Sequence, residues 1–251
     1  MMAAEAVVTM DGWCALHDTR IFDWTSWKMA SEKQRTEAVE EFKELMTKWE
    51  AVEDENNGSQ SIYKVLGNKA DLMFIFFRPT MDELEEIKRE INKSKIGDYL
   101  IPGYSYVSIV EMTMHNPMDE GKDRELSPYV KDRLKPIVPK WEHACFYPMA
   151  RRRWKDANWF EIDKEERTKL LYEHGMTGRK YAGKVKEIIT GSIGLDEYEW
   201  GVTLFAHDAL QFKKIVYEMR FDEVTAKYAE FGDFLVGNYL PKEDVSTYFA
   251  L

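Results

Sequence analysis

The chain has 251 residues, of which 44% are hydrophobic and 14% aromatic, and its formal net charge is −10. This composition excludes a disordered chain and predicts one large globular domain or two fused small ones. The acidic balance argues against a general nucleic-acid binder. The two cysteines, Cys14 and Cys145, lack metal-type spacing and favour a reducing cytoplasm. Without a basic amino-terminal region or a run of about 18 apolar residues, we expect neither a signal peptide nor a membrane span.

The first half of the chain predicts alternating strands and helices. The polar segment 53–60 indicates a loop, and Gly67-Asn68 indicates a turn between two strands. Strands are expected at 7–18, 61–66, 70–78 and 104–112, and helices at 31–49 and 81–92. The resulting order, β-α-β-β-α-β, is that of a ferredoxin-like unit, which we assign to residues 1–115.

A weak internal repeat predicts a second copy of this unit in residues 141–251. The segments LMFIFFRPTMDELEEIKREI and WGVTLFAHDALQFKKIVYEM are each a strand leading into an amphipathic helix, and another strand follows each of them. Strands are expected near 143–149, 198–206 and 228–239, with a helix at 209–220 and further helices within 163–190 inserted in this copy only. We therefore predict an α+β fold of two fused ferredoxin-like units whose sheets pack or extend together.

Residues 116–140 connect the two units. This segment is polar, contains proline and shows little hydrophobic periodicity. Connections of this length are usually functional or disordered, so the segment is either a mobile loop beside a binding site or a plain linker.

The HACFYPM run is a candidate strand with one chemically distinctive face. Because side chains alternate along a strand, Cys145, Tyr147, Met149 and Arg151 would share that face. Pro148 removes a ladder donor and suggests a strand end or a sheet edge. The pattern also fits an ordinary half-buried strand in which Tyr147 is anchored through its hydroxyl.

The helix that follows carries a histidine on its apolar face. Asp163 and Glu166 have the spacing of a capping box, and Gly175 is suited to end the helix. One face combines residues at i, i+3, i+4 and i+7: Arg167, Leu170, Leu171 and His174. An imidazole near a helix C-terminus suits a metal ligand or a cationic histidine, although a lone histidine on an apolar face is more often a satisfied core residue.

A basic cluster is unusual in this acidic chain: it consists of Arg151, Arg152, Arg153 and Lys155. An arginine fork matches a carboxylate bidentately, and Arg151 would face the same way as Tyr147. Arg220, at the end of a helix, and Thr225, in the next turn, are further candidate donors, with Arg179 and Lys180 of lower rank. A solvated turn would explain the cluster as well.

Several blocks of the chain resemble the Gram-positive coproheme decarboxylases, which belong to the chlorite-dismutase-like haem family. They are MDGWCALHD, GNKADLMF, DYLIPGYSYVSIVE, CFYPM, NWF, HGMTGRKYAGKV, EWGVTLF and YEMRFDEVTAKYAEFG, and together they extend over nearly the whole chain. The resemblance implies a dimeric α+β barrel-type subunit, a homopentamer, and a cytoplasmic oxidoreductase of haem biosynthesis.

The resemblance also implies the chemistry. The substrate and redox cofactor would be iron coproporphyrin III (coproheme), with His174 as the proximal iron ligand. Hydrogen peroxide would react at the iron, and a radical on Tyr147 would then take hydrogen from a neighbouring propionate, which loses carbon dioxide and becomes a vinyl. Two rounds would give haem b. The residues expected to contact the porphyrin and its carboxylates are Arg133, Tyr147, Met149, Arg151, Arg220 and Thr225.

One position departs from the family pattern. Glu187 lies where the decarboxylases have glutamine and the chlorite dismutases have arginine, which argues against chlorite chemistry. A buried carboxylate would have a raised pKa and could move a proton of peroxide, whereas on the outer side of a helix it would only face solvent. His115 is an alternative distal base. Trp159 and Trp200 are either core residues or carriers of oxidising equivalents.

Three functions therefore remain open. The first is a peroxide-dependent coproheme decarboxylase. The second is another haem enzyme, either a peroxidase or a chlorite-degrading protein. The third is a non-enzymatic haem carrier or sensor.

Overall fold

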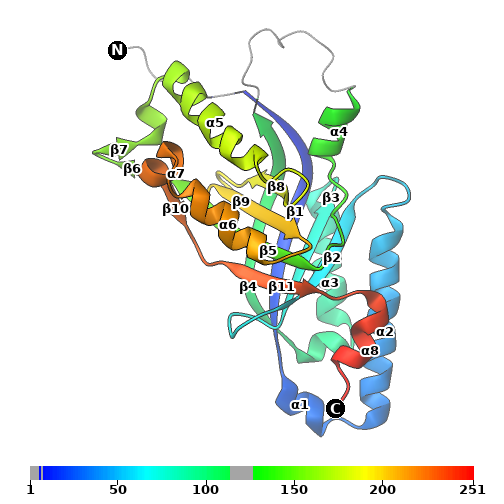
Figure 1. The fold of residues 1–251 in the computed structure, drawn as a ribbon. Helices are drawn as coiled ribbons and strands as arrows, with labels where there is room; N and C mark the ends of the chain where they lie inside the picture. Colours follow the sequence, from blue (N-terminus) through cyan, green and yellow to red (C-terminus); the bar gives the residue numbers. More distant parts are fainter. Residues whose placement is uncertain (1–5, 7, 114–126) are drawn as a thin grey trace.

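The computed structural model describes residue 6 and residues 8–113 and 127–251, and one large antiparallel sheet forms its centre (Figure 1). The strand order is β10-β5-β11-β2-β3-β1-β4-β8-β9, and β5 also pairs with β9, so that all strands except β10 close into a ring. The strands of this sheet are β1 (Thr9–Phe22), β2 (Ser59–Val65), β3 (Leu72–Arg78), β4 (Leu100–Thr113), β5 (His143–Arg151), β8 (Lys186–Gly191), β9 (Trp200–Ala206), β10 (Ala229–Phe231) and β11 (Leu235–Tyr239). The predicted α+β class is confirmed.

Two groups of helices cover the outside of the ring. The first group packs on β1 and β3 and comprises α1 (Trp24–Met29), α2 (Glu32–Ala51), α3 (Met81–Lys93) and α8 (Val245–Tyr248). The second lies beside β5, β8 and β9 and comprises α5 (Lys164–Arg179), α6 (Leu210–Met219) and α7 (Glu223–Tyr228) (Figure 1). Among the helices of the described residues, none is long and apolar enough to cross a membrane.

The strands and helices expected in the first half are confirmed, with small shifts in their ends. Helices α2 and α3 begin at capping boxes, in which Ser31 pairs with Gln34 and Thr80 pairs with Glu83. Such caps satisfy the free N–H groups of the first turn and fix the residue at which the helix begins, so the local sequence predicts where these helices start.

Both faces of the sheet are buried, and they divide the core in two. On β3, Phe74 and Phe76 pack under the first helix group, whereas Ile75 and Phe77 point into the ring. The inside of the ring is filled by side chains from many strands, including Phe146 of β5. The cavity described below lies on the outer face of the sheet.

The second half differs from the expectation at two places. Residues 186–191 form β8 and not a helix, because their Ile-Ile-Thr run alternates buried and partly exposed positions and pairs with both β4 and β9. The strand expected over 228–239 is divided into β10 and β11, which leaves Phe234 free to stack on Tyr147. With β8 included, the order β5-α5-β8-β9-α6-β11 matches β1-α2-β2-β3-α3-β4, so the prediction that the helix after 163 is an insertion is wrong.

A short helix, α4 (Pro128–Leu134), lies against β1 and β4 and carries Arg133. Gly12 of β1 permits this contact, since a Cβ at that position would collide with the backbone of Leu134. The remaining strands, β6 (Arg153–Trp154) and β7 (Ala157–Asn158), form a separate hairpin after β5. The expected segment 116–140 is thus described only from residue 127 onward.

Candidate active site

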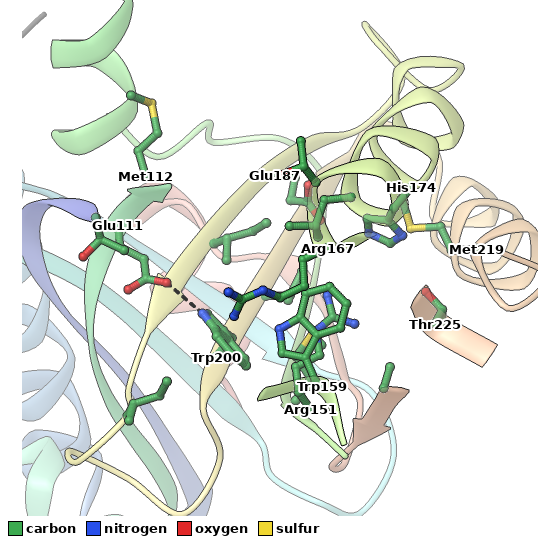
Figure 2. A pocket seen from close by; sticks show the side chains of 18 of the residues that line it. Glu111, Met112, Arg151, Trp159, Arg167, His174, Glu187, Trp200, Met219 and Thr225 are labelled. Atoms are coloured by element: carbon green, nitrogen blue, oxygen red, sulfur yellow. Dashed lines mark hydrogen bonds between the residues drawn. The ribbon is translucent and has the colours of Figure 1, made fainter. Parts of the chain in front are cut away.

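A cavity of about 1170 Å³ lies between the outer face of β5, β8 and β9 and the layer of α5, α6 and α7 (Figure 2). Apart from Arg220, the expected iron ligand, the expected porphyrin contacts and Glu187 all line it: Arg133, Tyr147, Met149, Arg151, His174, Glu187 and Thr225. They come from two strands and three helices that are far apart in the sequence. Of the two lower-ranked donors, Arg179 lines it and Lys180 is not among its lining residues. The predicted common face of β5 is confirmed, because Cys145, Tyr147 and Met149 share one apolar cluster beneath α6.

Tyr147 is held rigidly in the sheet wall. Its side chain is 5% exposed, and its ring stacks on Phe234 with 4.4 Å between centroids. Burial raises the pKa of its phenol well above the usual value, and Glu187 and Cys145 act in the same direction. The phenol therefore keeps its proton at neutral pH, so that it can donate a hydrogen atom or a hydrogen bond to a ligand in the cavity.

His174 lies on the opposite wall, near the end of α5. Its Nδ1 is 2.9 Å from Oδ2 of Asp222. With the proton on Nδ1 directed at this carboxylate, Nε2 keeps a free lone pair for a metal ion. Burial acts to raise the pKa of Asp222, but the hydrogen bonds from His174 and Thr225 outweigh it and the pKa is lowered. The pair thus provides an oriented imidazole beside a stable negative charge.

Asp222 was not predicted from the sequence. Its other oxygen, Oδ1, accepts the backbone N–H of Thr225 at 2.8 Å and caps α7. A capping pattern was readable in Asp222 and Thr225, but no local signal indicates that this cap reaches a histidine 48 residues earlier.

Glu187 enters the cavity from β8, so the alternative that it lies on the outer side of a helix is wrong. Its side chain is open to the cavity, yet the surrounding protein is dense enough to raise the pKa of its carboxyl. The positive charges of His174 in its protonated form and of the guanidinium of Arg133 act in the opposite direction. Figure 2 shows Glu187 and His174 bordering the same space. A carboxyl that exchanges its proton nearer to neutral pH is suited to general acid–base work.

The predicted arginines are in different situations. Arg151 is half-buried, with its Cζ 4.8 Å from the ring centre of Trp159, and burial lowers its pKa to about 10. Arg133 reaches the cavity from α4. Arg220 is not among the described residues that line the cavity, because its guanidinium lies over the ring of Phe231, with Cζ 3.9 Å from the ring centre.

The rest of the basic cluster, Arg152, Arg153 and Lys155, is not among the described residues that line the cavity. Arg152 approaches Glu230, and Arg153 pairs with Glu199. His115 lies outside the described residues.

Both predicted tryptophans border the cavity. Trp159 is buried and meets Tyr228 edge to face, with 5.5 Å between ring centres. Trp200 donates from Nε1 to Oε1 of Glu111 at 2.7 Å, and burial raises the pKa of this glutamate. Glu111 and the buried Arg167 were not predicted as site residues, since the sequence around each one reads as an ordinary strand or helix.

The chemistry of the donors limits what the cavity can hold. Within the described ranges, no group of three His, Cys, Asp or Glu side chains could bind a free metal ion. A single imidazole with an open Nε2 instead suits a metal ion that already has its other ligands, such as iron in a porphyrin. An apolar cavity with arginines on its walls suits a flat apolar ring that carries carboxylates.

Comparison with known proteins agrees with this reasoning. A family model described as chlorite dismutase matches residues 35–240. A protein of Oceanobacillus iheyensis described as coproheme decarboxylase is 75% identical over 248 residues, which cover 99% of this chain and 100% of that protein.

Two solved structures of similar fold agree with these sequence matches. A structure from Thermus thermophilus, described as a novel haem-binding protein, has a TM-score of 0.95 and 45% identity, with 100% of each chain covered. A variant of chlorite dismutase from Candidatus Nitrospira defluvii has a TM-score of 0.77 at 20% identity over 96% of each chain, and shows likeness of fold alone. From the family match and the near-complete alignment to its relatives, this chain belongs to the chlorite dismutase family.

Proposed function

We propose that the protein binds iron coproporphyrin III and uses hydrogen peroxide to convert two of its propionates to vinyls, giving haem b in haem biosynthesis. The relative from Oceanobacillus iheyensis supports this activity through its identity over the full chain. The observation that carries the proposal is the pairing, across one cavity, of the imidazole of His174 with the buried phenol of Tyr147.

Each round of the proposed reaction consumes one propionate, one peroxide and one proton, and yields a vinyl, carbon dioxide and two waters. The bound iron porphyrin supplies the redox chemistry, while the protein supplies placement and proton control. Tyr147 gives up a hydrogen atom and takes one back from the methylene chain of a propionate. His174 holds the iron, and Asp222 orients the imidazole. Glu187 accepts and returns a proton of peroxide.

The carboxylates of the substrate need fixed positive partners. We propose Arg133 and Arg151 for this role, with Thr225 as a hydroxyl donor and Met149 as an apolar contact along the ring. Arg220 remains a candidate through a change of side-chain rotamer that takes its guanidinium off Phe231.

We also propose that the two halves are fused ferredoxin-like units, residues 1–115 and 141–251 with the connection 116–140 between them, which form a dimeric α+β barrel-type subunit. The matching element order of the halves supports this division. A homopentamer in the cytoplasm is expected from the family resemblance, and the two free, buried cysteines fit a reducing compartment. Sedimentation of the purified chain tests the assembly.

The decisive experiment is an ultraviolet–visible titration with coproheme, followed by peroxide and separation of the products by chromatography. The wild-type protein should form haem b, whereas Tyr147→Phe should bind coproheme and leave it unconverted. Haem b formed by this variant at the wild-type rate would remove Tyr147 from the reaction. Rapid dioxygen release from chlorite would favour a chlorite-degrading enzyme, and binding without product would favour a carrier.

A further inference from the structure

Arg167 places a guanidinium on the wall of the cavity. It lies on α5 two turns before His174, its side chain is 7% exposed, and it borders the cavity. Figure 2 shows its side chain extending from α5 into the space among Glu187, Trp159 and Trp200. Neither the porphyrin contacts implied by the family resemblance nor the iron-binding pair accounts for this residue.

We propose that Arg167 binds a carboxylate at the rim of the porphyrin substrate, as an addition to Arg133 and Arg151. This inference rests on the proposed function, because it assumes that the cavity receives coproheme. The helix provides the geometry: seven residues span about 10 Å along the axis. An imidazole beneath the centre of a macrocycle and a guanidinium at its edge can therefore come from the same helix face.

The charge of Arg167 also favours this role. The side chain of arginine is a cation, so Arg167 adds a positive charge to the cavity wall in a protein with a net charge of −10. Because the side chain of Arg167 is already buried, contact with a carboxylate in the cavity costs it less conformational freedom than it would cost an exposed arginine.

Arg167 complements the other cavity arginines by its position. Arg151 approaches from β5 and Arg133 from α4, while Arg167 comes from α5, the helix that carries His174; Arg179, at the end of the same helix, also borders the cavity but is exposed and contacts Met176. Carboxylates distributed around a macrocycle need donors from several directions, and Arg220 points away at Phe231. Arg167 supplies a direction that the strand residues leave open.

The test is the affinity for metal-free coproporphyrin III, measured by porphyrin fluorescence, so that iron ligation by His174 does not mask the effect. We expect Arg167→Gln to weaken binding about tenfold to a hundredfold, as for the loss of a charge-assisted hydrogen bond. The tetramethyl ester of the same porphyrin lacks the ionised carboxylates, and its affinity should change less than about twofold. Arg89→Gln is the control, since Arg89 is an exposed residue of α3 that pairs with Glu86.

Equal weakening for the acid and the ester, or no weakening for either, would overturn the proposal. The melting temperature of each ligand-free variant verifies that it is folded. If Arg167→Gln does not fold, Arg167→Lys replaces it: the charge stays but the fork is lost, and binding of the acid alone should weaken by a smaller factor. Wild-type affinity of the lysine variant for the acid would then refute a guanidinium contact.

The outcome for the proposed function is separate. If the wild-type protein converts coproheme to haem b while Arg167→Gln binds coproporphyrin as tightly as wild type, only the role of Arg167 fails. If the wild-type protein binds no coproporphyrin, both proposals fail.

Discussion

Replacing Asp222 by Asn should lower the affinity of the protein for ferric coproheme without disturbing the fold. The asparagine retains Oδ1, which accepts the backbone N–H of Thr225 and caps α7. It removes the negative charge that lies 2.9 Å from Nδ1 of His174. The side chain of Asp222 is only 9% exposed, so solvent screens this contact little.

A hydrogen bond to a charged group of this kind contributes about 1.5–3 kcal/mol. Losing the partner that orients a metal-binding histidine typically lowers metal affinity about tenfold to a hundredfold. We therefore expect ferric coproheme to bind Asp222→Asn more weakly by a factor in that range. Metal-free coproporphyrin III should bind as it does to wild type, because it forms no bond with His174.

The assay is a pair of titrations, one with ferric coproheme followed at the Soret band and one with the metal-free porphyrin followed by fluorescence. Asp163→Asn is the matched control: Asp163 caps α5 by accepting the N–H of Glu166 at 2.8 Å. Equal weakening for the two porphyrins would mean that Asp222 shapes the cavity and does not act through iron. Unchanged affinity for ferric coproheme would refute the orienting role.

Two further predictions concern pH. The dense surroundings of Glu187 raise the pKa of its carboxyl. The peroxide-dependent rate of the wild type should therefore change as pH rises through that pKa and the carboxyl loses its proton, whereas Glu187→Gln should show no such step. Identical pH–rate profiles would exclude Glu187 from proton transfer. Burial lowers the pKa of His17 from its usual 6.5 to about 3. Between these two pH values the unfolded chain binds more protons than the folded chain. The free energy of unfolding therefore falls as pH drops through this window, by about 1.4 kcal/mol per pH unit. Urea unfolding between pH 7 and pH 4 should show a shallower loss for His17→Gln, and equal slopes would contradict this assignment.

Local chemistry made much of the fold predictable. The helices at Ser31 and Thr80 begin where the sequence indicates, because a cap involves residues only three positions apart. The strand β8 was not predicted, because its six residues come soon after a segment with a helical pattern and because their strand conformation depends on pairing with β4 and β9. The closure of the ring between β5 and β9 likewise depends on contacts that no short-range pattern records.

The site shows the same division. The alternation of side chains along β5 correctly predicted that Tyr147, Met149 and Arg151 share one face, and all three line the cavity. The role of Asp222 could not be predicted from the sequence, because only the packing of α7 beside α5 brings its carboxylate to the imidazole of His174. For Arg220, the sequence indicates its place at the end of a helix but not the stacking on Phe231 that turns it aside.

The strand that carries Tyr147 is hydrogen-bonded along both edges, to β9 on one side and to β10 and β11 on the other. Phe234 stacks on the ring as well, so neither the backbone nor the side chain has room to travel. If Tyr147 reacts with both propionates, its fixed position leaves two routes to the second one: either the macrocycle turns between the two losses of carbon dioxide, or the radical migrates to another residue. On the first route, turnover would depend on how readily the proposed arginine contacts release and recapture the ring, and very tight retention of the half-converted porphyrin would slow the enzyme.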